Sequence, residues 1–236
     1  MEIVEHDNWL YTPEGESRGY IQPHALTELW FHTGTKCNLA CDFCLEGSSP
    51  SDKRLGTPKL AEIKPYIDEA LTLGVEQFSF TGGEPFLAKD IIDILAYASQ
   101  FKPCLVLTNG TDPLIKRFDA LCALQAKNQH PISLRISIDS PIEKTHDLAR
   151  GEGNFAKAFI GMRMLHNHGF NVSLARHIAN AEDTALVDQQ YQALFELNGL
   201  PKNMNIVAFP DFLPPGALPN VPHITTHCMT TYQNDA

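Results

Sequence analysis

Three cysteines lie within eight residues of one another in the segment TGTKCNLACDFCLEG, at Cys37, Cys41 and Cys44. This spacing lets a single loop present three thiolates to an iron–sulfur cluster, which usually takes four protein thiolates. Three ligands would leave one iron open, as catalytic metal sites keep one position open for substrate or cofactor. One alternative is a zinc site that borrows a distant ligand such as His32, although zinc sites favour paired Cys-x2-Cys units. A second alternative is that the three cysteines are close in sequence by chance.

The other three of the six cysteines are scattered along the chain. Cys104 and Cys122 lie in apolar segments, which is typical of small buried side chains. His223, His227 and Cys228 have a loosely ligand-like spacing, and we interpret them as solvated residues of the tail. The clustered triplet favours metal or redox chemistry over disulfides.

Composition and charge narrow the class of protein. The chain has 236 residues, of which 43% are hydrophobic and 19% charged, as in ordinary globular proteins. A formal net charge of −10 argues against a general nucleic-acid or anionic-membrane surface. We find no apolar run near the roughly 20 residues that cross a bilayer. The acidic N-terminus lacks a signal-peptide pattern, so we expect a cytoplasmic protein without a membrane partner.

Strand-like and helix-like segments alternate from about residue 26, which predicts βαβ units and a parallel sheet. Strands are predicted at 26–33, 75–80, 104–108, 132–139, 171–178 and 204–209. Helices are predicted at 57–74, 88–100, 113–127, 154–168 and 183–198. Pro65 predicts a kink or a later start in the first helix.

The fourth predicted strand, ISLRISID (132–139), alternates apolar with polar residues. Because side chains alternate faces along a strand, one face would meet helices and the other would be polar. Parallel strands buried on both faces usually read as continuous apolar runs. The alternation favours a partly open barrel with a polar lumen, and a half-exposed mixed sheet is the alternative. Candidate lumen residues are Gln77, Ser79, Arg135, Ser173, Arg176 and His177.

We therefore predict an α/β fold, a partial (β/α)6 TIM-like barrel with parallel strands inside and helices outside. The barrel would span residues 26–209. Residues 1–25 would form an N-terminal extension, and residues 210–236 an irregular C-terminal tail. The polar residues Glu84, Asn109 and Asp139 come at or after strand ends, where barrels of this kind gather their active sites.

Four segments together resemble the radical S-adenosylmethionine (radical SAM) superfamily. Cys-x3-Cys-x2-Cys with Phe43 before the last cysteine is similar to the family signature. TGGEP (81–85) follows the second strand, as in that family. TNG (108–110) and SIDSPIEKTHDLARGEGNF (137–155) resemble the branch that includes peptide maturases and the molybdenum-cofactor GTP cyclase. The resemblance covers about residues 28–180, in order.

The resemblance implies two cofactors, a [4Fe–4S] cluster on Cys37, Cys41 and Cys44 and S-adenosylmethionine at the open iron. It implies a flavodoxin or ferredoxin-type electron donor. It also implies a 5′-deoxyadenosyl radical that abstracts hydrogen from a small-molecule or peptide substrate.

The resemblance also assigns cofactor contacts, each beside a simpler role. Gly82, Gly83 and Glu84 would bind the methionine amino group, although Gly-Gly-Glu-Pro is also an ordinary turn. Ser137 and Asp139 would lie at the ribose hydroxyls, and Asp139 could merely cap a turn. The remaining candidates are Asn109, which could reach the cofactor or only form a turn, Arg150 at the cofactor carboxylate or on the surface, and Phe43 near the adenine or simply packed.

Two other functions stay open at this point. The chain could be a truncated or degenerate member that binds cluster and cofactor without turnover, or a zinc-binding interaction module. Members of the resembling branch commonly carry a cysteine-rich C-terminal region for auxiliary clusters, and only Cys228 lies beyond residue 122 here. The chain therefore either lacks that region or is a piece of a longer protein, and its substrate is not indicated.

Overall fold

The computed structural model describes residues 10–19, 24–179, 182–210 and 224–229. The chain forms two compact units. The larger unit is Ala25–Gly216, and the smaller one combines the two chain ends, Met1–His24 and Ala217–Ala236. Within the described ranges, no helix has both the length and the apolarity needed to cross a membrane.

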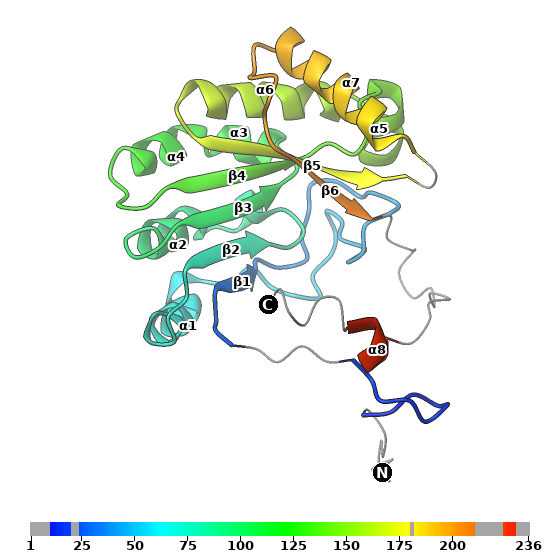
Figure 1. Cartoon of the computed structure of the whole chain (residues 1–236). Coiled ribbons are helices and arrows are strands. Elements are labelled where there is room, and N and C mark those ends of the chain that lie inside the picture. Colours follow the sequence, from blue (N-terminus) through cyan, green and yellow to red (C-terminus); the bar gives the residue numbers. More distant parts are fainter. Residues whose placement is uncertain (1–9, 20–23, 180–181, 211–223, 230–236) are drawn as a thin grey trace. The chain divides into compact units, whose positions relative to one another are not determined.

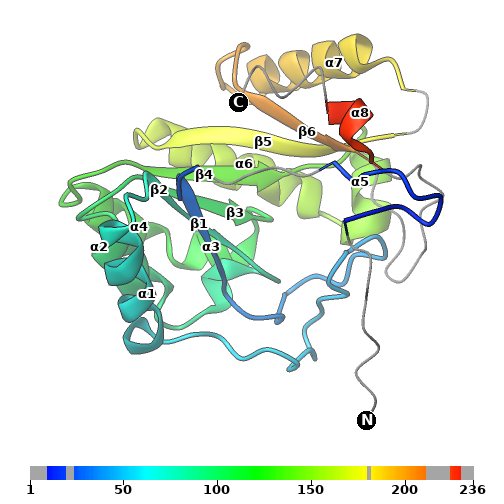
Figure 2. The ribbon, with the colours of Figure 1, turned by 60° about the horizontal axis from the view of Figure 1, so that its bottom comes forward.

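The larger unit is built on one six-stranded parallel sheet whose strands follow chain order. The strands are β1 (Glu28–His32), β2 (Gln77–Thr81), β3 (Cys104–Thr108), β4 (Ile132–Ser137), β5 (Asn171–Ile178) and β6 (Ile206–Pro210). β1 and β6 lie at the two edges, and in the described residues they do not pair with each other (Figure 2). The sheet is an open one, and the prediction of a partial six-stranded barrel is confirmed.

Helices connect successive strands and cover one face of the sheet (Figure 1). They are α1 (Leu60–Thr72), α2 (Ile91–Ala98), α3 (Asp112–Lys116), α4 (Phe118–Gln125), α5 (Glu143–Arg150), α6 (Asn154–Asn167) and α7 (Thr184–Leu197). A short 3-10 helix, η1 (Pro85–Leu87), follows β2. The strand arrows in Figure 1 point toward the light-blue loop that follows β1.

The core lies between the sheet and these helices. In β4, Ile132, Leu134 and Ile136 are fully buried while the alternate residues are half-buried. The apolar stripe of α1, with Ile63 and Ile67, is buried in the same cluster. Full burial of one such side chain stabilises the fold by about 1.5–3 kcal/mol, so this alternation strongly favours a single register.

Three helices differ from the prediction. α1 begins at Leu60, after the predicted residue 57, and it contains Pro65, so the helix does not start at the proline. The helix predicted at 113–127 is two helices, α3 and α4, separated at Arg117. α5 was not predicted because His146 is its buried residue and its sequence has no apolar stripe.

In the smaller unit, the chain ends pair with each other. Tyr11 forms an antiparallel bridge with Ser17, and Arg18 forms one with Thr225. A short helix, α8 (Thr226–Met229), follows and carries an exposed His227. His223 and the side chain of Cys228 lie outside the described residues, so their predicted role as solvated tail residues stays a prediction.

Candidate functional site

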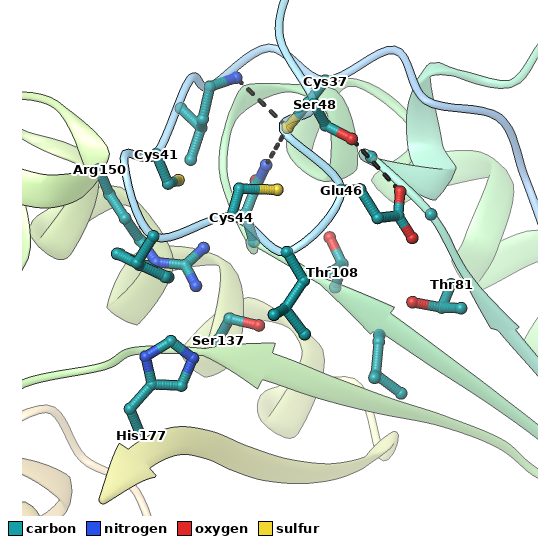
Figure 3. A pocket seen from close by; sticks show the side chains of 17 residues that line it. Cys37, Cys41, Cys44, Glu46, Ser48, Thr81, Thr108, Ser137, Arg150 and His177 are labelled. Carbon is teal, nitrogen blue, oxygen red and sulfur yellow. Dashed lines mark hydrogen bonds between the residues drawn. The ribbon is translucent and has the colours of Figure 1, made fainter. Parts of the chain in front are cut away.

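The three clustered cysteines line one side of a cavity of about 220 Å³ at the carboxyl ends of the strands (Figure 3). They come from the loop 33–59 after β1, whereas Ser137 and His177 face the cavity from β4 and β5. The remaining lining residues are Leu39, Phe43, Leu45, Glu46, Ser48, Thr81, Gly82, Gly83, Leu107, Thr108, Asn109 and Arg150. The cavity therefore brings together residues from four strand ends and the cysteine loop.

Hydrogen bonds to backbone and sulfur shape the cysteine loop. The Cys44 N–H donates to the Cys41 carbonyl at 3.1 Å, which closes a tight turn between these two residues. Cys37 is buried, and its sulfur accepts from the Leu39 N–H at 3.4 Å and from Asn109 Nδ2 at 3.8 Å. Burial raises the pKa of the Cys37 thiol to about 11. A thiolate in this position would therefore need a bound metal, which deprotonates cysteine ligands.

The Gly-Gly-Glu segment after β2 packs directly against the cysteine loop. Gly83 N–H donates to the Gly34 carbonyl at 2.9 Å, and Glu84 N–H donates to the Lys36 carbonyl at 3.0 Å. A Cβ at Gly83 would lie 2.4 Å from the Lys36 oxygen, and a Cβ at Gly82 would lie 2.7 Å from the Gly34 oxygen. The glycines thus allow two backbone segments to approach each other, beside the cavity that both also line.

The Glu84 carboxylate is buried and bonds to the chain itself. Oε1 accepts from Thr108 Oγ1 at 2.8 Å and from Phe86 N at 3.1 Å, while Oε2 accepts from Asn109 N at 2.9 Å. Burial raises the pKa of Glu84, and these three donors oppose that rise. Glu84 therefore ties the end of β2 to the end of β3, and its contact with a cofactor amino group stays a prediction.

A polar network joins Asn109 to the cysteine loop. Asn109 Nδ2 donates to Asn38 Oδ1 at 2.9 Å, and Asn109 Oδ1 accepts from Thr111 Oγ1 at 2.6 Å. Asn38 Nδ2 closes the network by donating to Thr111 Oγ1 at 2.9 Å. Asn38 and Thr111 are not among the residues predicted from the sequence. The position of Asn38 directly after Cys37 is the feature that could have identified it.

Arg150 and Asp139 form a mostly buried ion pair at the cavity wall. Arg150 Nη2 donates to Asp139 Oδ1 at 3.1 Å, and Arg150 Nε donates to Oδ2. Burial by itself raises the pKa of Asp139. The charge and the hydrogen bonds of Arg150 lower it by more, so the pKa lies below its ordinary value. Of this pair, Arg150 lines the cavity and Asp139 holds it from behind.

The Phe43 ring reaches from the cysteine loop to this pair. Its centroid lies 5.3 Å from the Arg150 guanidinium carbon and 4.7 Å from the His177 ring, which it meets edge to face. Both contacts are of the kind that stabilise aromatic side chains. The ring thus anchors the loop across the cavity to α5 and β5.

His32 does not complete a fourth-ligand site. His32 Nε2 lies 2.8 Å from Glu46 Oε1, and His32 Nδ1 accepts from the Gly34 N–H at 3.1 Å, so both ring nitrogens are engaged. No three Cys, His, Asp or Glu side chains within the described ranges gather to hold a single metal ion. Three free thiols around a shared cavity fit a larger cluster that bridges them.

Comparison with known proteins decides the family. The sequence profile described as "Radical SAM superfamily" matches residues 31–179. The chain belongs to the radical SAM superfamily. The resemblance in the four motif segments is thereby confirmed, as are the family's cofactors, a [4Fe–4S] cluster and S-adenosylmethionine.

Several radical SAM relatives are similar over most of this chain. The antilisterial bacteriocin subtilosin biosynthesis protein AlbA of Bacillus subtilis is 34% identical over 169 residues, covering 71% of this chain and 36% of AlbA. Mycofactocin maturase MftC of Mycobacterium ulcerans is 28% identical over 171 residues, covering 70% of this chain and 44% of MftC. The chain thus spans less than half the length of either relative.

Among solved structures, SuiB of Streptococcus suis bound to S-adenosylmethionine matches with a TM-score of 0.66 at 16% identity. The match covers 81% of this chain and 42% of SuiB. SuiB bound to its precursor peptide SuiA matches with a TM-score of 0.62 at the same identity, covering 80% of this chain and 40% of SuiB. These likenesses support the radical SAM fold.

Five of the six lumen candidates of this radical SAM barrel lie on strand positions that face the lumen. Gln77, Arg135 and Ser173 line a second cavity, and His177 lines the first. Ser79 is buried on the same face of β2 as Gln77. Arg176 was predicted wrongly: it is fully buried and pairs with Glu182 at 2.7 Å and with Asp188 of α7 at 3.0 Å. Because it precedes His177 directly, the pleat of β5 places it on the opposite face.

Proposed function

We propose that this chain is the catalytic barrel of a radical SAM enzyme that abstracts a hydrogen atom from a peptide substrate. The observation that carries the proposal is the shared cavity, in which three free thiols of one loop face the carboxyl ends of β2 to β5. Active sites of barrels of this kind form at that end of the strands.

The thiolates of Cys37, Cys41 and Cys44 would hold the [4Fe–4S] cluster. When bound, the cluster supplies the electron that breaks a carbon–sulfur bond of S-adenosylmethionine and yields the 5′-deoxyadenosyl radical. The protein would bind and orient the nucleotide and exclude water around it. The hydrogen bonds of Leu39 and Asn109 to the Cys37 sulfur would stabilise the negative charge of that ligand.

Five other lining residues would hold S-adenosylmethionine. The edge at Gly82 and Gly83 would take the methionine amino group, and Arg150 would pair with the carboxylate through its planar fork. Ser137 would bond to a ribose hydroxyl, and the backbone near Phe43 would contact the adenine. All five line the same cavity as the cysteines, which supports a common ligand.

Asp139, Glu84 and Asn109 would act differently from the direct contacts that the family resemblance implies. Asp139 would fix the guanidinium of Arg150, since both of its carboxylate oxygens accept from that residue. Glu84 would hold the end of β2 against β3. Asn109 would position the cysteine loop through Asn38 and the Cys37 sulfur.

A peptide is favoured over a small molecule because of the similar proteins. SuiB, which shares the fold, has been solved with a precursor peptide bound. Mycofactocin maturase and a bacteriocin biosynthesis protein are similar in sequence.

A flavodoxin or ferredoxin-type protein would supply the electron. The five described cysteines are all free thiols, which supports a reducing compartment such as the cytoplasm.

The proposal is tested by anaerobic reconstitution with iron and sulfide, followed by S-adenosylmethionine and dithionite. Wild type and the control Cys122→Ala, which lies on α4, should turn brown and form 5′-deoxyadenosine. Cys41→Ala should do neither. A colourless wild-type protein containing zinc would refute the proposal in favour of a zinc module, and a brown protein that forms no 5′-deoxyadenosine would indicate a member without turnover.

A further inference from the structure

A second cavity lies in the lumen, on the side of the proposed cofactor cavity that faces the amino ends of the strands. Its volume is about 280 Å³, and its lining includes Gln77, Leu105, Ser133, Arg135, Ser173 and Asn205. Leu107 and Ser137 line the first cavity from the same strands, each two residues farther along. Residues two apart share a face and lie about 7 Å apart along a strand, so the two cavities follow each other along the inner faces of β3 and β4.

Arg135 brings a positive charge into this lumen, and no carboxylate of the described residues forms an ion pair with it. Its Nε donates to Ser173 Oγ at 3.3 Å, and no other group in the described part of the chain accepts a hydrogen bond from its guanidinium. By contrast, Arg54, Arg150 and Arg176 each have a carboxylate oxygen within 3.1 Å. Arg135 is therefore an inward-facing guanidinium with four N–H donors still to be used.

Glu28 of β1 is the carboxylate that acts electrostatically on Arg135, but its hydrogen bonds come from neutral donors. Glu28 Oε1 accepts from Gln77 Nε2 at 2.7 Å and from Ser79 Oγ. Glu28 attracts Arg135 electrostatically, yet in the described residues the two do not form an ion pair. The fold thus keeps Glu28 and Arg135 apart, and the Arg135 guanidinium remains available to a ligand.

We propose that Arg135 binds a carboxylate of the substrate, next to the cofactor cavity. A guanidinium presents parallel N–H groups that match the two oxygens of a carboxylate, and partial burial strengthens such a bond. The carboxylate would come from an acidic side chain or from the C-terminus of a peptide. That the ligand is the substrate rests on the proposed function. The Arg135 site adds that the barrel would select substrates with a carboxylate at this position.

Binding of short probes to the reconstituted full chain, measured anaerobically by calorimetry with S-adenosylmethionine present, tests this site. N-acetyl-glutamate N-methylamide carries a side-chain carboxylate, and its glutamine counterpart is the neutral control. N-acetyl-alanine and its N-methylamide form the same pair for a terminal carboxylate. At least one carboxylate probe should bind roughly tenfold or more tightly than its neutral partner, as hydrogen bonds to charged groups allow.

Arg135→Gln should remove that preference, and Arg135→Lys, which keeps the charge but not the fork, should weaken it less. Arg117→Gln is the matched control, because Arg117 lies between α3 and α4 and donates to the Lys89 carbonyl at 3.4 Å. Modification of arginine side chains by phenylglyoxal tests the same site in the wild-type protein, without any substitution. The carboxylate probe should slow modification of Arg135, read by peptide mass spectrometry, and leave Arg117 unaffected.

Equal binding of carboxylate and amide probes would overturn the proposal. The proposal would also be overturned if neither carboxylate probe bound, or if a folded Arg135→Gln variant kept the preference for the carboxylate. Binding needs no turnover, so the two proposals fail separately. A wild-type protein that prefers the carboxylate but forms no 5′-deoxyadenosine would contradict the proposed function and leave the Arg135 site standing.

Discussion

Arg150 Nη2 donates to Asp139 Oδ1 at 3.1 Å in the wall of the cavity that the three cysteines share. The two side chains are 11% and 13% exposed, so the pair is nearly shielded from water. Because Arg150 also lies against the Phe43 ring, the pair connects α5 and the end of β4 to the cysteine loop. The charge that faces the proposed nucleotide is thus held by a second residue behind it.

Asp139→Asn should destabilise the protein by about 3 kcal/mol, because it leaves the buried Arg150 guanidinium without its countercharge. Asp112→Asn is the matched control, since Asp112 pairs with Lys157 at 2.9 Å with both side chains about half exposed. The control should cost less than about 1 kcal/mol. Urea unfolding of both variants measures the difference, and equal costs would show that the Arg150 pair is energetically an ordinary surface pair.

Gly83→Ala should disrupt the docking of the cysteine loop. The added Cβ would lie 2.4 Å from the Lys36 carbonyl oxygen, which is backbone and cannot rotate away. We expect a loss of about 2 kcal/mol or more and less iron bound per chain after reconstitution. Gly56→Ala places its Cβ in open space and should change stability by less than about 0.5 kcal/mol. Full iron content in Gly83→Ala would contradict the role given to this contact.

His146 makes folding stability depend on pH. Burial is the main cause that lowers the pKa of His146 to about 4, and the positive charge of Arg150 is the second. The Nδ1 of His146 is buried and has no hydrogen-bond partner among the described residues. An unfolded histidine has a pKa of about 6.5, so between these values the unfolded chain binds more protons and stability falls as pH falls. Between pH 7.5 and 5.5 this group should cost about 1 kcal/mol.

The measurement for His146 is anaerobic urea unfolding at these two pH values for wild type and His146→Leu. The leucine variant cannot take up a proton at this position, so its stability should change less with pH by that amount. An identical pH dependence in the two proteins would show that His146 is not held neutral in the folded state.

Strand periodicity and motif order predicted the sheet, because both depend on local sequence. β3 and β5 match the predicted ranges, and the cysteines, Gly82, Gly83, Asn109 and Ser137 all line the cavity. Arg176 and His177 are both predicted in the lumen, although neighbouring residues of a strand face opposite sides. The sequence does not show that Arg176 pairs with Glu182, which follows β5, and with Asp188 of α7.

Tertiary pairing was not accessible from the sequence. Asp139 and Arg150 are eleven residues apart, and nothing in either motif indicates that they bond to each other. Glu84 meets Thr108 and Asn109 across 24 and 25 residues. These contacts depend on the parallel register of β2 and β3 and on the position of α5, a helix without an apolar stripe.

The EPR spectrum of the reduced, reconstituted protein, with and without S-adenosylmethionine, tests directly whether Cys37, Cys41 and Cys44 hold a cluster that binds the nucleotide. We expect a [4Fe–4S] signal that changes when S-adenosylmethionine is added, because three cysteines leave one iron for the nucleotide to bind. A signal that stays the same at saturating S-adenosylmethionine, or a protein with no such signal, would contradict it.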